Sequence, residues 1–307
     1  MNNLASTYVM QGKYADLEKI RIKALDLMHR LLGDEHPQTI TKMYHLANLY
    51  KAQGRYADEE KLEAKILDLR CMALGEEHPD TITAMSKLVV TYILQEKYAD
   101  AEKVQIKILD QRKRLLGEEH SETITAMNNL ADIYGSLGIY AGAEELRIIV
   151  LDLQNRLLGE EHPEAINAMS NLAVTYQNLG KYGDAEKLQI KVLDSRNRLL
   201  GEEHSEKITA MNHLADIYGS LGKYTDCEEL GIKVLNLRSR LLGEEQPETI
   251  TAMSNLAATY QNLGKHADAK KLQIKVVDLR NKLLGDEHPD TINAMKNLAM
   301  TFYSASF

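Results

Sequence analysis

The octapeptide LLGEEHPE, residues 157–164, contains the run GEEH, in which two glutamates and a histidine are consecutive. Such a cluster has the residue types of a metal site or of a general acid and base pair. It also has the residue order of one helix end followed by a helix start. A glycine ends the first helix, and a proline with nearby acids begins the second.

The stretch recurs through the chain with a period of 42 residues, without insertion or deletion. A second glycine recurs with the same period, and Glu96 replaces it once. A catalytic cluster seldom recurs in every repeat, whereas helix ends must, and Gln246 replaces the histidine once without disturbing the frame. We therefore interpret the stretch as a joint between helices, with no catalytic or metal site. The glycines of the joints are Gly33, Gly75, Gly117, Gly159, Gly201, Gly243 and Gly285.

Two amphipathic patterns lie between successive joints. In one repeat, Ile166, Met169 and Leu172 mark the apolar face of a helix over residues 163–179, which we name helix A. After Gly180 a second pattern predicts a helix of about 18 residues, helix B, which is apolar on two sides. Because neither helix can bury its apolar face within one hairpin, the hairpins must stack. The sequence thus predicts an all-α fold, an α-solenoid forming one array over residues 1–307.

The array has a predicted internal division. A partial first helix A covers residues 1–11, seven 42-residue periods follow, and an unpaired last helix A covers about 289–303. No domain boundary is predicted.

Composition restricts the classes of function. Hydrophobic residues make up 44% of the chain and charged residues 27%, which is typical of a folded protein. The net charge is −8 with basic residues evenly spread, so we expect no nucleic-acid partner. No signal peptide or membrane span is present in the pattern, and we expect a cytoplasmic protein with no membrane partner. The cysteines, Cys71 and Cys227, are predicted to be free thiols.

The run NLAVTYQNLGKYGDAEKL, residues 171–188, resembles the tetratricopeptide repeat (TPR) in the spacing of its Leu-Ala, Tyr, Gly, Tyr and Ala. The usual unit has about 34 residues. The longer period resembles the variety found in kinesin light chains and in the arrays of fungal NLR-type proteins. The resemblance covers the whole chain. It implies a right-handed superhelix with helices A on the concave face, and binding of a protein or peptide of unknown identity.

Two helix A positions are not used in the predicted packing and form a polar ladder. Asparagine amides both donate and accept, so the ladder could hold an extended peptide by its backbone. The alternative is that these residues are merely solvated positions copied by duplication. The candidate partner-binding residues are His45, Lys87, Asn128, Asn129, Ser170, Asn171, Asn212, His213, Ser254 and Asn255.

The last helix A has no helix B after it in this sequence. Its apolar residues would remain uncovered, which predicts self-association into a homo-oligomer. The alternative is that the sequence is part of a longer array. The residues concerned are Ile292, Met295, Leu298 and Phe302.

The preferred interpretation is a non-enzymatic interaction scaffold that needs no cofactor, because nothing interrupts the repeat to build a catalytic cluster. The alternatives are a self-associating structural array and a sensor fragment of a larger NLR-type protein. A metal-binding protein that uses the GEEH residues as ligands is a less favoured alternative, and no metal site is predicted. No P-loop motif is present in the chain.

Overall fold

The computed structural model describes residues 2–201 and 203–304, with side chains from residue 14 to residue 302, Glu202 excepted. Over these residues the chain is helical, without strands. The helices alternate between the two predicted types, so the α-solenoid class is confirmed. Helices A are α2 (Pro37–Ala52), α4 (Pro79–Leu94), α6 (Ser121–Ser136), α8 (Pro163–Asn178), α10 (Ser205–Ser220), α12 (Pro247–Asn262) and α14 (Pro289–Ser304). Helices B are α3 (Tyr56–Leu74), α5 (Tyr98–Leu116), α7 (Tyr140–Leu158), α9 (Tyr182–Leu199), α11 (Tyr224–Leu242) and α13 (His266–Leu284), and α1 (Asn2–Leu32) precedes them all.

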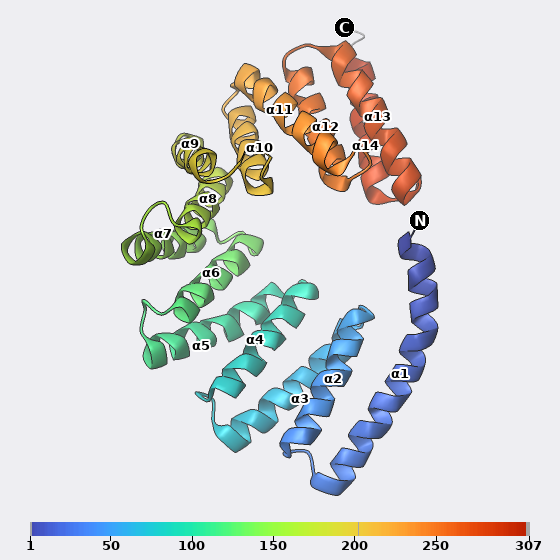
Figure 1. Cartoon of the computed structure of the whole chain (residues 1–307), viewed down its shortest axis with the longest axis vertical. Coiled ribbons are helices and arrows are strands. Elements are labelled where there is room, and N and C mark those ends of the chain that lie inside the picture. Colours follow the sequence, from blue (N-terminus) through green and yellow to red (C-terminus); the bar gives the residue numbers. More distant parts are fainter. Residues whose placement is uncertain (1, 202, 305–307) are drawn as a thin grey trace. The chain divides into compact units, whose positions relative to one another are not determined.

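The chain divides into two compact units, residues 1–146 and residues 147–307. In unit 1 each helix from α1 to α6 packs against the next, and in unit 2 the same holds from α8 to α14 (Figure 1). None of the described helices is long and apolar enough to cross a membrane.

The core of each hairpin repeats with the sequence. In unit 1, Ile40 and Met43 of α2 pack with Ile66 of α3 and Ala84 of α4. In unit 2, Ile208 and Met211 of α10 pack in the same way with Val234 of α11 and Ala252 of α12. Each cluster therefore joins a helix A, its helix B and the following helix A. The hairpin is completed only by its neighbour, as the two apolar sides of helix B predict.

The joints show what the GEEH stretch does. His162 is the residue before α8, and its Nδ1 accepts a hydrogen bond from the Glu164 N–H at 3.3 Å, so the imidazole caps the helix. The histidines that precede α2, α4, α6 and α10 make the same bond. Gln246, the exception, makes no such side-chain bond. The second acid also has a structural partner, since Glu161 pairs with Arg198 near the end of α9 at 2.8 Å.

A second contact, at the joints where helix B carries an arginine five residues before the glycine, was not anticipated from the sequence. Arg196 of α9 donates to the carbonyl of Glu206 in the first turn of α10 at 2.9 Å. Arg112 and Arg238 make the equivalent bond to Glu122 and Glu248. These arginines fix the end of a helix B to the start of the next helix A.

The structure differs from the predicted division at the first helix. The partial first helix A predicted over residues 1–11 is not a separate element, because α1 runs as one helix from Asn2 to Leu32. A continuous helix keeps the backbone hydrogen bonds of successive turns.

Candidate functional site

In three repeats, an alanine and a glutamine four residues apart on helix B lie at the seam between helix B and the next helix A. In α9 these are Ala185 and Gln189, both fully buried. The Gln189 Nε2 donates to the carbonyl of Ala210 in α10 at 3.0 Å. In α5 the pair is Ala101 and Gln105, and Gln105 bonds to the Ala126 carbonyl at 2.9 Å. A small residue and a glutamine thus seal the seam.

The seam between α11 and α12 lacks this seal. Cys227 and Gly231 occupy the two positions, so no glutamine spans the seam. The Cys227 Sγ lies 3.2 Å from the Thr259 hydroxyl. A Cβ on Gly231 would lie 3.2 Å from Leu256 Cδ1, so Leu256 lies close against the glycine. The result is a hollow of about 380 Å³, lined by residues of α8, α10, α11 and α12, which we name the Asp216 hollow.

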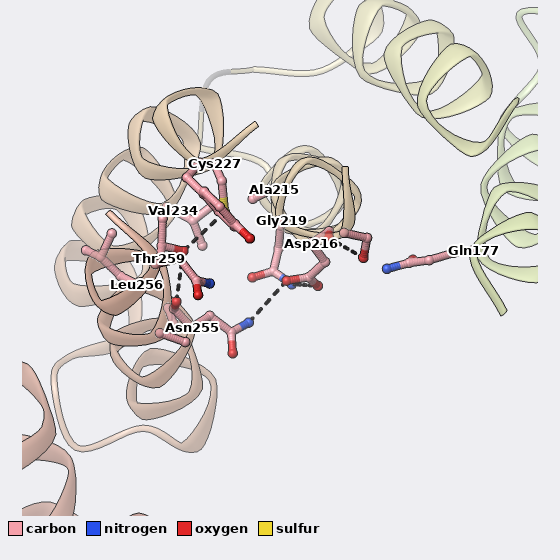
Figure 2. A pocket seen from close by; sticks show the side chains of 16 residues that line it. Gln177, Ala215, Asp216, Gly219, Cys227, Val234, Asn255, Leu256 and Thr259 are labelled. Atoms are coloured by element: carbon pink, nitrogen blue, oxygen red, sulfur yellow. Dashed lines mark hydrogen bonds between the residues drawn. The ribbon is translucent and has the colours of Figure 1, made fainter. Parts of the chain in front are cut away.

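Asp216 of α10 lies between Gln177 of α8 and Asn255 of α12 in this hollow (Figure 2). Its Oδ2 accepts from the Asn212 amide at 3.1 Å, and its Oδ1 accepts from the Asn255 amide at 3.4 Å. Burial raises the pKa of Asp216 to about 6, and the charge of Arg238 opposes that rise. The carboxylate is therefore ionised at neutral pH and poorly solvated.

The seam between α3 and α4 of unit 1 also departs from the repeat. Glu59 and Glu63 stand at the same two positions, and both are buried. Thr91 donates to the Glu63 Oε2 at 2.6 Å, and the Glu59 carboxylate lies 3.8 Å from the Lys51 Nζ. Burial is the largest cause of the raised pKa of each glutamate. This seam holds a hollow of about 350 Å³ that Lys51 and Lys87 also line.

The ladder predicted from the sequence is exposed at only one of its two positions. Asn129, Asn171, Asn255 and His45 are exposed. At the preceding position, Ser170 is buried, contrary to the expectation that it can be read by a partner, because its side chain lies in the packed interface.

The other ladder residues are half-buried. The Ser254 hydroxyl bonds to the Ile250 carbonyl of its own helix, and Lys87 lies over the Tyr44 ring, with its Nζ 5.0 Å from the ring centroid. Burial is the main cause of the lowered pKa of His213. Asn128 and Asn212 are also half-buried. The structure brings Asn212 and Asn255 together at Asp216.

The face of α14 remains uncovered in this chain. Ile292 is 40% exposed, Met295 38% and Phe302 46%, whereas Leu298 is half-buried. The equivalent apolar residues of α12, such as Ile250 and Met253, are buried.

Sequence reasoning missed Asp216, Cys227 and Gly231. The signal was present, because the two helix B positions read Ala and Gln in three repeats and differ in the others. The differing residues are Leu17 and Arg21, Glu59 and Glu63, Arg147, and Cys227 and Gly231. Across the described residues, no group of three histidine, cysteine or acidic side chains is placed to hold a metal ion.

Comparison with known proteins gives the family. Two family models described as tetratricopeptide repeat match residues 1–72 and 80–146, and residues 166–206, 208–248 and 249–290. A search of curated protein sequences finds no match.

The fold is similar to several solved structures. A protein of Podospora anserina described as a kinesin light chain with nearly identical TPR-like repeats is 25% identical, with a TM-score of 0.59 over 68% of this chain and 99% of that one. BtubC (BKLC) of P. vanneervenii is 20% identical, with a TM-score of 0.63 over 76% of this chain and 94% of that one. The STAND protein PH0952 of Pyrococcus horikoshii, which has a tetratricopeptide repeat sensor, is 13% identical, with a TM-score of 0.59. That match covers 93% of this chain and 43% of the other. The chain therefore belongs to the tetratricopeptide repeat family, with repeats like those of kinesin light chains.

Proposed function

We propose that this protein is a non-enzymatic scaffold that binds an extended segment of a partner protein along its helices A. TPR proteins in general mediate protein–protein interactions. The observation that carries the proposal for this chain is the set of exposed amides at one helix A position. In unit 2 these are Asn171, Asn255 and Asn297, with His213 at the same position of α10.

Amides at this position suit a peptide backbone. Each asparagine side chain offers two donors and an acceptor, so it can bond both to the N–H and to the C=O of an extended chain. Because the ladder follows the repeat, a segment that binds Asn255 meets Asn297 in the following hairpin. Between Asn171 and Asn255 it passes His213. Recognition by backbone gives affinity, and specificity must come from side-chain pockets beside the ladder.

The test is selection of randomised 12-residue peptides on the full chain, followed by affinity measurement on variants. Asn171→Ala with Asn255→Ala is expected to weaken binding by on the order of tenfold, since each hydrogen bond contributes about 1 kcal/mol. The matched control is Asn197→Ala with Asn281→Ala, which removes two exposed asparagines from helices B. Equal effects of the two double variants, or no selected peptide, would refute the proposal.

A second candidate function is self-association through α14. A second copy would cover its exposed apolar face in the way that a neighbouring hairpin covers each helix A in the interior of a unit. Light scattering against concentration should show assembly that Ile292→Glu with Met295→Glu abolishes. A chain that stays monomeric at high concentration would contradict this candidate. The sensor-array alternative stays a prediction, since 13% identity to PH0952 concerns the fold alone.

A further inference from the structure

The Asp216 hollow combines a missing side chain with an added charge. Gly231 lines the hollow at the position where the α9–α10 seam has Gln189, and Asp216 places a carboxylate in the same hollow. Among the described residues that line the hollow, Asp216 alone is charged at neutral pH. Gly231 and Asp216 lie on separate helices, α11 and α10, and both line one cavity.

We propose that the Asp216 hollow takes a lysine or arginine side chain of the bound partner segment, with the cationic group on the Asp216 carboxylate. This inference rests on the proposed function, because the segment that carries the basic side chain lies along the ladder. Asn255 connects the two sites, since it is a ladder residue and its amide also bonds to Asp216.

The carboxylate has unused capacity to accept hydrogen bonds. Its two oxygens provide about four acceptor positions, and the Asn212 and Asn255 amides use two of them. A lysine ammonium or an arginine guanidinium supplies several donors. Arg238 is the cation whose charge lowers the pKa of Asp216. It donates to the carbonyl of Glu248 at the start of α12, however, and does not line the hollow.

The walls of the hollow suit the stem of such a side chain. Ala215, Val234 and Leu256 offer apolar surface, against which the methylenes of lysine or arginine can pack while the charged end reaches a polar group. An acidic side chain would meet the like charge of Asp216. An apolar side chain would take water from the carboxylate without replacing its hydrogen bonds. The hollow therefore favours a basic side chain over both.

The test uses the peptides selected on the full chain. Each lysine or arginine of a selected peptide is replaced in turn by glutamine. The affinities of the original (basic) peptide and of the glutamine peptide are measured for the wild-type protein and for Asp216→Asn. We expect Asp216→Asn to weaken the basic peptide by about tenfold or more, as for close charge pairs at interfaces. The glutamine peptide should bind both proteins equally. Gly231→Gln, which fills the hollow, should weaken the basic peptide to the same extent.

A matched control separates this pairing from general charge attraction. Asp194→Asn removes the same charge from the exposed face of α9 and should leave the affinity unchanged. The inference is overturned, and the proposed function stands, if selected peptides bind along the ladder without a basic residue that couples to Asp216. The inference is likewise overturned if Asp194→Asn and Asp216→Asn weaken the peptide equally. If no peptide is selected, the proposed function fails and the inference fails with it.

Discussion

The substitution Gly231→Gln tests whether the Asp216 hollow is an unfilled side-chain position of the repeat. Gly231 lies inside α11, and Gln189 of α9 stands one repeat earlier with its amide on the Ala210 carbonyl. A glutamine at residue 231 is expected to reach the Ala252 carbonyl, the equivalent acceptor in α12. The variant should therefore gain both helix propensity and one buried hydrogen bond.

The magnitude follows from four contributions. Replacing an interior helix glycine by glutamine gains about 0.5 kcal/mol, and a net hydrogen bond adds about 1 kcal/mol. Burial of two methylenes adds about 1.5 kcal/mol. Ordering the side chain costs about 1.5 to 2 kcal/mol, and Leu256 must move by a few tenths of an ångström. The net expectation is a stabilisation of about 1 kcal/mol.

Thermal unfolding of the full chain measures this change. For a cooperative unit of the size of residues 147–307, about 1 kcal/mol raises the transition midpoint by roughly 2–4 °C. Gly231→Ala separates the effects, because it supplies propensity and meets Leu256 but has no amide. The reverse change, Gln189→Gly, should open the α9–α10 seam and lower the midpoint. A midpoint for Gly231→Gln at or below that of Gly231→Ala would refute the interpretation of the hollow as a vacated glutamine position.

Four further variants test the helix caps, the turn at Glu96 and the buried charge. Gln246→His should add the missing cap of α12 and raise the free energy of unfolding in urea by about 0.5–1 kcal/mol. His162→Ala should lower the free energy of unfolding by a similar amount. Unchanged midpoints in both variants would show that the caps contribute nothing. Glu96 has φ +59° where other repeats place glycine, so Glu96→Gly should gain up to about 1 kcal/mol; a loss would mean that the Glu96 side chain stabilises the turn. Asp216→Asn should stabilise the chain at pH 7 by up to about 3 kcal/mol. The reason is that the pKa of Asp216 in the folded protein, about 6, exceeds its value in the unfolded chain, so folding penalises the ionised carboxylate. That gain should shrink as the pH falls from 6 and vanish below about pH 4, so a gain that is constant with pH would contradict it.

The fold could be predicted closely because the same pattern of glycines and apolar residues occurs in every repeat. The glycines at the joints, the apolar steps of helix A and the two-sided helix B each recur, so a single misread residue changes nothing. The position of α8 was predicted at 163–179 and is found at Pro163–Asn178. At residues 1–11, where the pattern is incomplete, the structure has the continuous helix α1 in place of a separate partial helix A.

The candidate site was less predictable because burial at a seam depends on three helices together. The sequence showed which ladder residues are polar, but Asn171 is exposed and Ser170, its neighbour in the chain, is buried. Periodicity along one helix cannot give this difference, because the following hairpin determines which side of the helix it covers.

By itself, the sequence determined the class of fold, the length of the repeat and the structural role of the GEEH joints, because these follow from local periodicity and helix-end chemistry. Only the tertiary structure showed that Asp216 and Gly231 meet. They lie on different helices and neither is unusual alone, since a glycine in a helix or an aspartate on a surface has many explanations. Packing α10, α11 and α12 together turns an absent side chain into a hollow and takes water away from the carboxylate beside it, and it is this loss of solvent that raises the pKa of Asp216.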